Sequence, residues 1–542
     1  MRTTSRPHPI RRIAAVAAAA ALLLTGCGAA QGQPQASGEA EVAQGGTLRV
    51  GFGGADVANY DPHQRPQLFP RTVTRQIADT LTEQDPETGE ILPWLAESWE
   101  ISDDTTEFTF HLREGVTFSD GTPLDAEAVA ANFDRIVEIG PLAFIAGSYF
   151  RGYVGAEVLD ERTVRVTFDA PNAQFLQATA TQSLAILAQA TLELDPERVA
   201  AGEVIGSGPF TIESYEPEQR LVLAAREDYA WPSPIAENEG RAHYDTVEIS
   251  FLPDATTLAG SVQSGQLDFA YILDASTTST IEASGATLLR TPMPAISIPL
   301  VPLLHREVFQ DEDLRRALSL ATDREAIVDT VFQGAYVPAT GVLTTTNPGY
   351  VDLSDELQHD PEAAAELLDG TAWSTVGDDG IRTDDAGEPL AITIQYTGGG
   401  TTETLLQLVQ QQWRQVGIDL RLEPVADLSE FTIHDYPFDI TTWSQTRADP
   451  DVLRIVYSSF YENQSFLYGH ADAEVDEALG RLQTTVDPAE RLEASETVQR
   501  LLLERGYTVP LYDLVQFSAA APGIQGAHAD IEGKPFFADL HG

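Results

Sequence analysis

The sequence predicts an α/β protein with at least two lobes. Its 542 residues exceed the size at which a single hydrophobic core stops growing, roughly 250–300 residues. Residues 390–451 alternate between strand-like and helix-like patterns, which is typical of parallel sheets covered by helices. The hydrophobic fraction of 43% is ordinary for a globular protein.

The clearest pattern in the chain is a βαβ unit. Residues 391–396 alternate apolar and polar side chains, and the glycine-rich run 397–402 ends this strand. A helix should follow and end at Gly417, because apolar residues recur there at three- and four-residue spacing: Leu405, Leu406, Leu408, Val409, Trp413 and Val416. Residues 418–423 alternate again and predict the second strand.

A further strand is predicted at residues 438–443, and it runs into a charged loop at 444–451. The strands of a βαβ unit are parallel, and its crossover is right-handed. Ligands of open α/β sheets bind in the crevice beyond the carboxyl ends of such strands. The loops at 397–402 and 444–451 should therefore share one rim of a binding site.

The charge balance excludes one class of partner. The formal net charge is −51, and Lys534 is the only lysine. Such a field repels phosphate backbones, so the sequence predicts no binding to nucleic acid. We interpret the acidity as a heavily solvated surface suited to a salty medium. The alternative is a role in attracting cationic ligands.

The N-terminus has the pattern of a secretory signal peptide, predicted for residues 1–26. Several arginines precede the apolar run 13–24, which is too short to span a bilayer. The pair Arg11-Arg12 leaves twin-arginine export as an alternative to general secretion. Residues 27–44 lack periodicity and are rich in Ala, Gln and Gly, so we expect a flexible tether.

The segment Leu24-Thr25-Gly26-Cys27 resembles the lipobox of bacterial lipoproteins. The resemblance implies cleavage before Cys27 and attachment of diacylglycerol to its sulfur. Cys27 is also the only cysteine, so an intramolecular disulfide is impossible. Since two or more acyl chains anchor a protein stably, the folded part should stay on the extracytoplasmic face of the cell membrane.

The first half of the folded part carries a series of short motifs. Residues 45–52 are expected to form a turn and a strand, and the loop 59–63 precedes a helix near Arg71. Asp120-Gly121 is a hairpin-type turn signal. Asp125 can cap the helix that follows it.

These motifs, and the order in which they follow one another along the chain, resemble those of the extracellular solute-binding protein family 5. This family comprises the oligopeptide-, dipeptide- and nickel-binding receptors of ABC importers. Residues 92–136 are similar to its signature region, with PWLAESWE followed by FTFHLREGVTFSDGTPLDAEAV. Later matches are residues 206–210, 309–318 and 412–418. The resemblance covers the chain from Gly45 to its last residue.

The resemblance implies a two-lobe fold like that of periplasmic binding proteins, of type II in the large cluster C form. Lobe 1 is expected to hold residues 45–295 with an inserted sub-domain, lobe 2 residues 296–506, and residues 507–542 return to lobe 1. The chain would cross between the lobes near 296–302 and again near 507–513, which makes a hinge. Ligand would lie in the cleft and be enclosed when the lobes close.

Three loops at predicted strand ends supply the candidate ligand-binding residues. The first lobe contributes one of them, Tyr60. The other two loops contribute the rest, which are Tyr396, Gly398, Gly399 and Thr401 in one and Trp443, Thr446, Arg447 and Asp449 in the other. Backbone N–H groups at 398–402 lie at a predicted helix N-terminus and can receive an anion, although the glycines can also serve the turn alone.

Two of these candidates carry specific chemistry. Trp443 offers a flat apolar face and an N–H donor; the alternative is a position in the core. The planar fork of Arg447 matches a carboxylate of a ligand. The alternative for Arg447 is an ion pair with Asp449 or Asp451.

The residue at position 446 limits the substrate class. In the peptide-binding relatives, an acidic residue three positions after the equivalent tryptophan holds the terminal ammonium of the peptide. Thr446 stands at that place here. This leaves a peptide, a modified peptide, an opine- or sugar-like solute or a metal chelate as the ligand. The scattered histidines show no ligand spacing, so no metal site and no cofactor are expected.

We therefore expect a monomeric lipoprotein that captures a small molecule or peptide and delivers it to ABC permease subunits. A sensor lipoprotein that presents bound ligand to a membrane partner is an alternative that uses the same cleft. A secreted hydrolase is the third alternative, but the sequence lacks GxSxG, HExxH and Walker-type motifs, and its one cysteine is assigned to the lipid. The sequence thus predicts binding without catalysis.

Overall fold

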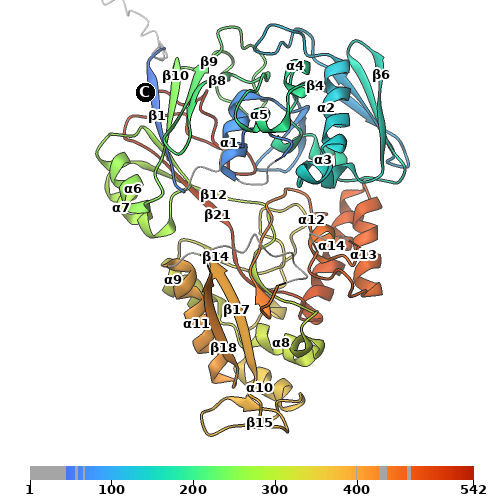
Figure 1. Cartoon of the computed structure of the whole chain (residues 1–542), viewed down its shortest axis with the longest axis vertical. Helices are drawn as coiled ribbons and strands as arrows, with labels where there is room; N and C mark the ends of the chain where they lie inside the picture. The colour runs from blue at the N-terminus through green and yellow to red at the C-terminus, as the bar shows by residue number, and fades with distance from the viewer. Residues whose placement is uncertain (1–43, 55–58, 65–67, 398–399, 426–435, 461–464) are drawn as a thin grey trace, which may run out of the picture. The chain divides into compact units, whose positions relative to one another are not determined.

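Two mixed β-sheets form the frame of the protein, in a computed structural model that describes residues 44–54, 59–64, 68–397, 400–425, 436–460 and 465–542 (Figure 1). These residues belong to one unit, residues 42–542. The seven-stranded sheet has the order β12 (Thr287–Pro292), β21 (Val515–Ala520), β11 (Phe269–Tyr271), β1 (Thr47–Phe52), β10 (Thr246–Phe251), β9 (Arg220–Ala225), β8 (Phe210–Glu216). The six-stranded sheet has the order β14 (Val337–Pro338), β20 (Val509–Asp513), β13 (Ile298–Pro302), β19 (Ile440–Thr441), β17 (Ala391–Thr397), β18 (Asp419–Val425).

Smaller sheets and helices complete the structure. A four-stranded sheet has the order β4 (Ala96–Ile101), β5 (Glu107–Leu112), β7 (Thr163–Phe168), β6 (Tyr153–Asp160), and two strand pairs are β2 (Thr82–Gln84) with β3 (Ile91–Pro93) and β15 (Thr375–Val376) with β16 (Arg382–Thr383). The α-helices are α1 (Leu68–Ile77), α2 (Ala126–Glu138), α3 (Phe175–Ala178), α4 (Gln189–Leu192), α5 (Pro196–Ala200), α6 (Ala255–Gln263), α7 (Thr278–Ala283), α8 (Glu312–Leu320), α9 (Arg324–Phe332), α10 (Pro361–Asp369), α11 (Thr401–Gln415), α12 (Val452–Tyr457), α13 (Ala473–Thr484) and α14 (Pro488–Glu504).

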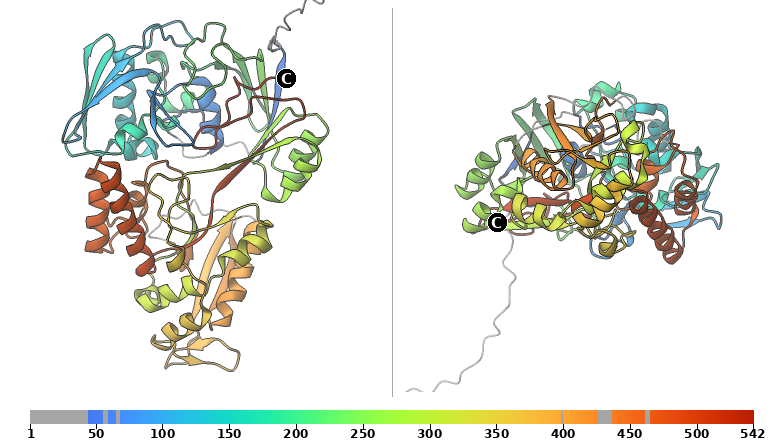
Figure 2. Two further views of the ribbon diagram at one scale, coloured as in Figure 1. Left: turned by 180° about the vertical axis from the view of Figure 1, so that it is seen from behind. Right: turned by 90° about the horizontal axis from the view of Figure 1, so that it is seen from below.

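Two antiparallel strand pairs, which we call the connecting ribbon, join the two large sheets. β12 leads through residues 293–297 into β13, and β20 leads through Leu514 into β21. β12 pairs with β21 in one sheet and β13 pairs with β20 in the other, so the two passages lie side by side. Figure 2 shows the yellow-green and dark red chains of this ribbon together. We expected the chain to cross between the lobes at 296–302 and 507–513. Most residues of these two segments instead lie within β13 and β20 of the six-stranded sheet.

A buried carboxylate holds the connecting ribbon where it passes between the sheets. Asp513 accepts hydrogen bonds from the hydroxyl of Ser297 at 3.0 Å and from the backbone N–H of Thr345 at 2.9 Å. Met293 N–H donates to the carbonyl of Leu514 at 2.9 Å. Burial raises the pKa of Asp513, although both hydrogen bonds favour its ionised form. The two passages are therefore fixed to one another by side-chain and backbone contacts.

The predicted βαβ unit is confirmed. β17 and β18 pair in parallel and α11 connects them. Gly417 follows α11 with φ +93°, a conformation that other residues rarely adopt, so the helix ends where its glycine predicts. The further strand is also present and parallel, because Ile440 of β19 pairs with Ile394 of β17. It is shorter than expected, since β19 covers only Ile440–Thr441.

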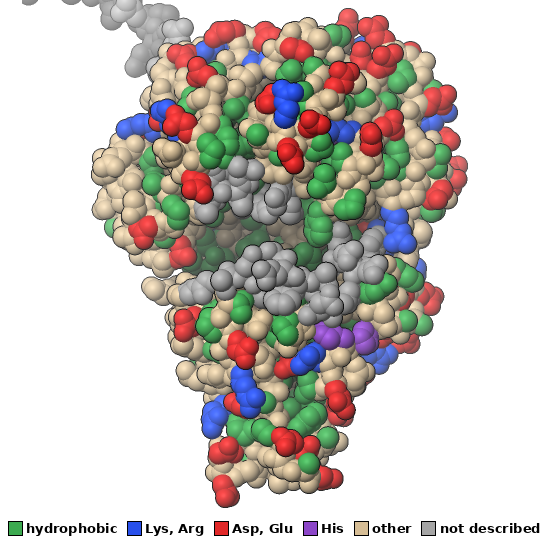
Figure 3. All heavy atoms as spheres, in the orientation of Figure 1, with side chains coloured by type: hydrophobic (Ala, Val, Ile, Leu, Met, Phe, Trp, Pro, Cys, Tyr) green, Lys and Arg blue, Asp and Glu red, His purple; other side chains and the backbone are tan. Residues whose placement is uncertain are grey.

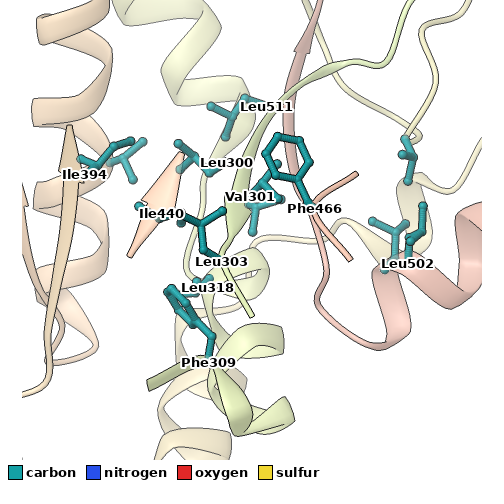
Figure 4. Packing of buried hydrophobic residues seen from close by; sticks show 14 of the residues in the cluster. Leu300, Val301, Leu303, Phe309, Leu318, Ile394, Ile440, Phe466, Leu502 and Leu511 are labelled. Atoms are coloured by element: carbon teal, nitrogen blue, oxygen red, sulfur yellow. The ribbon is translucent and has the colours of Figure 1, made fainter. Parts of the chain in front are cut away.

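The hydrophobic core of the six-stranded sheet combines residues from distant parts of the chain. Figure 4 shows Ile394, Ile440 and Leu300 from three adjacent strands, with Leu511 of β20 beside them. The opposite ends of the cluster come from α8 and α14. Each fully buried leucine or isoleucine of this kind contributes roughly 1.5–3 kcal/mol of transfer free energy. The apolar residues of β17 alternate because every second side chain of this strand is buried in the core.

The four-stranded sheet and α2 form a separate core, attached to the loop at 59–64 by buried charges. Asp125 caps α2 as predicted, accepting a hydrogen bond from the N–H of Ala128 at 2.9 Å. On the same helix, Arg135 donates to both carboxylate oxygens of Asp61 and contacts Nδ1 of His63 at 2.7 Å. Burial lowers the pKa of His63 to about 4, so its ring is neutral near pH 7 and accepts from Arg135. The loop is thus tied to α2 through one arginine.

The only lysine of the chain is part of a buried charge cluster. Lys534 is 1% exposed and forms an ion pair with Glu532. Arg71 also pairs with Glu532, and it donates to the hydroxyl of Thr181 at 3.1 Å. Burial alone would raise the pKa of Glu532, but Arg71 and Lys534 outweigh it and lower this pKa to about 2. The charges of the cluster stabilise one another where water is excluded.

We expect the stability of the protein to fall in acid because of Glu532. Its pKa of about 2 lies below its ordinary value of 4.5, so its contribution is present above pH 4.5 and is lost as the pH falls toward 2. Glu532→Gln should remove about 3 kcal/mol of unfolding free energy at pH 7 and flatten its dependence on pH between 4.5 and 2. Urea unfolding at several pH values measures both effects.

The matched control for this experiment is Glu239→Gln, because Glu239 lies exposed on the surface. Its unfolding free energy should follow that of the wild type at every pH. If the unfolding free energies of Glu532→Gln and the wild type changed with pH in the same way, the carboxylate of Glu532 would contribute nothing to the stability in acid.

Candidate functional site

A cavity of about 370 Å³ lies at the carboxyl ends of the parallel strands β17 and β19, and we call it the sheet-edge cavity. Its walls come from strands β13 and β20, from helices α9 and α11, and from the residues that follow β19 and β20. The lining residues are Ile298, Leu300, Phe332, Thr401, Thr402, Leu405, Leu406, Thr442, Trp443, Ser444, Leu511, Tyr512 and Leu514. Figure 3 shows a hollow bordered by hydrophobic side chains in the region between the labels β12 and β14 of Figure 1.

The two loops predicted to share a rim both contribute to this cavity, but each with only part of its residues. Thr401 and Thr402, at the first turn of α11, line it together with Ser444, which follows β19. α11 starts after Gly400, whose φ of +63° suits a residue without a Cβ. Because both loops follow parallel strands, their ends meet at one edge of the sheet.

The connecting ribbon supplies the floor of the sheet-edge cavity. Ile298 of β13 and Tyr512 of β20 are paired across the ribbon, and both line the cavity. The ring of Tyr512 lies 4.8 Å from that of Phe332, at the end of α9. Burial raises the pKa of the Tyr512 hydroxyl, so it stays protonated at physiological pH and can donate a hydrogen bond.

Trp443 lies in the cavity wall rather than in the core. Its side chain is half-buried, and its ring meets the ring of Phe466 edge to face at 5.8 Å. The next residue, Ser444, donates its hydroxyl to the carbonyl of Ile296 at 2.6 Å. That contact fixes the turn after β19 against the connecting ribbon, so the indole has a defined place at the cavity.

Arg447 makes a contact between the two halves of the chain that the sequence did not indicate. It is 0% exposed, and its two terminal nitrogens donate to Oε1 of Gln174 at 3.0 Å and to the hydroxyl of Ser148 at 2.7 Å. Its guanidinium lies 4.0 Å from the ring centre of Tyr149. Its Nε is buried without a hydrogen-bond partner among the described residues. Contact of Arg447 with a ligand carboxylate stays a prediction.

The alternative ion pairs for Arg447 are wrong, because other arginines occupy the two carboxylates. Arg491 donates to both oxygens of Asp449, each at 2.7 Å. Arg454 holds both oxygens of Asp451. Burial would raise the pKa of Asp449, but Arg491 outweighs it and lowers this pKa.

Asp449 lies at a different cavity from the one that contains Trp443. This second cavity has a volume of about 330 Å³, and Asp449 and Arg491 line it together with Gln84 and Gln177. The carboxylate is 2% exposed and fully engaged by Arg491. The structure therefore gives Asp449 an ion-pairing role and does not bring it to Thr401 or Trp443.

Both tyrosines among the candidates need a correction. Tyr60 is buried in the core of the seven-stranded sheet, where its ring meets those of Phe69 and Tyr215. Tyr396 is buried in the core of the six-stranded sheet. Neither lines the sheet-edge cavity, because each side chain points to the apolar layer rather than beyond the strand end.

The remaining candidate residues differ in whether they line the sheet-edge cavity. Thr401 lines the sheet-edge cavity. Thr446 is half-buried and its backbone pairs with Ala295, outside the cavity lining. Gly398 and Gly399, and also Cys27, lie outside the described residues.

Sequence reasoning missed most of the apolar wall. Leu405 and Leu406, which belong to the apolar spacing that predicts α11, are buried and also line the cavity. Ile298, Leu300 and Leu511 belong to the two crossing runs. The apolar character of those two runs could have predicted their place in the wall, because segments that pass between two lobes border a cleft between them.

No three His, Cys, Asp or Glu side chains in the described part of the chain are grouped so that they could hold a metal ion. Nor does any helix there combine the length and apolar character needed to cross a membrane.

The sequence model of bacterial extracellular solute-binding proteins, family 5 Middle, matches residues 90–466. The chain belongs to this family. The family 5 protein is 25% identical over 484 residues to heme-binding protein A of Haemophilus influenzae, an alignment that covers 84% of each chain.

Solved structures with the same fold cover nearly the whole of this family 5 protein. The oligopeptide-binding protein AppA from Bacillus subtilis, in complex with a nonapeptide, matches with a TM-score of 0.76 and 21% identity over 92% of this chain and 99% of AppA. NikA from Brucella suis, in complex with Fe(III)-EDTA, matches with a TM-score of 0.78 and 24% identity over 91% and 99%. The fold is therefore the two-lobe type II periplasmic-binding-protein fold of family 5 that the sequence predicts.

Arg447→Lys should weaken the contact between the two halves of this family 5 protein. A lysine keeps the charge but has no planar fork, so it cannot reach Gln174 and Ser148 together or stack equally well on Tyr149. We expect a loss of about 2 kcal/mol in unfolding free energy and a larger radius of gyration in X-ray scattering. Arg316→Lys, at an exposed arginine, is the control. Unchanged stability and scattering would contradict a role in holding the halves together.

Proposed function

We propose that the protein is the solute-capturing lipoprotein of an ABC importer, which takes up a peptide or peptide-like small solute between its lobes and delivers it to permease subunits. The observation that carries this proposal is the sheet-edge cavity, whose floor is the ribbon that connects the two large sheets. A ligand there contacts the elements about which the sheets can turn. Binding can therefore be coupled to closure, the form that a permease would recognise.

The ligands of the relatives support more than one solute class. Heme-binding protein A is named for a heme ligand, AppA was solved with a nonapeptide and NikA with Fe(III)-EDTA. A peptide-like solute is our first choice, because the cavity offers an apolar surface together with hydroxyl and indole donors. A metal chelate, an opine or a sugar-like solute is the second choice.

We further propose that residues 45–295 and the return segment 507–542 form lobe 1, that residues 296–506 form lobe 2, and that a lipid on Cys27 keeps both at the outer face of the membrane. The distribution of strands between the two large sheets supports the division except at β20, which lies in the return segment but pairs within the six-stranded sheet. The lipobox-like segment before Cys27 supports the anchor. The proposed unit is a monomer.

A sensor lipoprotein that presents its ligand to a membrane partner would use the same cavity. A hydrolase would instead need a nucleophile or an activated water there. The lining offers hydroxyl groups but, among the described residues, no histidine, carboxylate or lysine to activate them. This observation favours reversible binding over catalysis.

A ligand panel tests the proposed capture. Purified protein is heated with peptides, opines, sugars or metal chelates, and the unfolding transition is recorded. A true ligand at 100 times its dissociation constant should add roughly 2.7 kcal/mol of stability, and mass spectrometry should recover it unchanged. Stabilisation by none of the compounds, or turnover of any of them, would count against the proposal.

A second test concerns the anchor. Cys27→Ala removes the only thiol that could accept the lipid, so the variant should appear in the medium while the wild type stays with the membrane. Immunoblots of the two fractions measure this. Retention of Cys27→Ala in the membrane fraction would show that another feature holds the protein there.

A further inference from the structure

We propose that the sheet-edge cavity selects a ligand that places no cationic group in it: an apolar body with an oxygen acceptor, and no free ammonium. This inference rests on the proposed function and specifies the ligand class for the same site. An N-blocked or cyclic peptide-like compound should therefore bind better than the same compound with a free amine.

Among the residues that the structure describes, the lining of the cavity has no negatively charged side chain to receive an ammonium. Its described residues divide into an apolar group and a group of neutral hydrogen-bonding side chains. The apolar residues are Ile298, Leu300, Phe332, Leu405, Leu406, Leu511 and Leu514, and the polar ones are Thr401, Thr402, Thr442, Trp443, Ser444 and Tyr512. An ammonium moved from water into such a site loses its hydration without gaining an ion pair, which is strongly unfavourable.

The carboxylates near the lining in sequence have hydrogen-bond partners of their own. Glu403, next to Thr402, accepts a hydrogen bond from the side-chain amide of Gln407 at 3.1 Å. Asp513, between Tyr512 and Leu514, accepts hydrogen bonds from the hydroxyl of Ser297 and the backbone N–H of Thr345. Beyond Ser444, both oxygens of Asp449 and both oxygens of Asp451 are held by arginines. Recruiting any of them to a ligand would break charge-assisted hydrogen bonds, which are among the strongest in proteins.

The start of α11 disfavours a cation further and favours an oxygen acceptor. This helix spans Thr401–Gln415, and its first turn lines the cavity through Thr401 and Thr402. Its N-cap residue, Gly400, has no side chain with which to satisfy the first N–H groups. These groups and the helix dipole give the wall a partial positive charge, which Glu403 in the same turn offsets in part although it is not among the lining residues. A carbonyl, hydroxyl or carboxylate oxygen suits that wall, and an ammonium does not.

The test compares three probes of similar size on the full mature chain: Leu-Leu, N-acetyl-Leu-Leu and cyclo(Leu-Leu). Calorimetric titration should give at least tenfold tighter binding for the acetylated or the cyclic compound than for Leu-Leu. Equal or tighter binding of Leu-Leu would overturn the inference. So would the failure of both compounds without an ammonium to bind.

A matched pair of variants assigns the effect to the cavity wall. Thr401→Asp adds a carboxylate to the lining at a helix start, where acidic residues are well tolerated. Thr404→Asp adds the same charge to the same turn at an exposed residue outside the lining. Thr401→Asp should shift the ratio of affinities about tenfold toward Leu-Leu, and Thr404→Asp should leave it unchanged. A similar shift in both variants would overturn the inference, because a long-range field would then explain it.

The outcomes also separate this inference from the proposed function. If an amine-bearing solute from the wider panel binds the wild type and Thr401→Asp strengthens that binding, the capture function stands and the selection against cations is wrong. If no solute of either class stabilises the wild type, the capture function itself fails.

Discussion

The connecting ribbon is the constraint on which the rest of the structure depends. One antiparallel ladder, β12 with β21, belongs to the seven-stranded sheet, and its continuation, β13 with β20, belongs to the six-stranded sheet. Asp513 joins the two passages through Ser297 and Thr345. The chain passes from a strand of one large sheet to a strand of the other at residues 293–297 and at Leu514. The same ribbon lines the sheet-edge cavity, so the connection between the sheets and the candidate binding surface share residues.

The chain has few positively charged side chains, and several of them are buried. The sequence has 32 Lys and Arg residues against 83 Asp and Glu residues. Arg71, Arg135, Arg447 and Lys534 are all buried in contacts with acidic or polar groups. Carboxylates such as Asp61 and Glu532 are buried with them, so the excess of acidic side chains lies on the surface, as the face in Figure 3 illustrates. Salt screens such a surface, while the buried pairs are screened far less.

Local patterns predicted the βαβ unit and its helix end well, because alternation, three- and four-residue spacing and a terminal glycine each reflect a short-range requirement. The site was predicted less completely. Thr401 and Trp443 were found because they follow parallel strands, and both line the cavity. Tyr60 and Tyr396 were misplaced for the same reason. Proximity to a strand end does not determine whether a ring faces solvent or the apolar layer.

The sequence by itself determined the α/β class, the family, the parallel strands and the rim at which their loops meet, since these follow from periodicity, order of motifs and chain connectivity. Only the tertiary structure decided which carboxylates are free. Asp449 and Asp451 pair with Arg491 and Arg454, while Arg447 contacts Gln174 and Ser148 from the other half of the chain. Asp451 and Arg454 are only three positions apart, but Arg447 contacts residues 273 and 299 positions away, and no local pattern encodes such contacts.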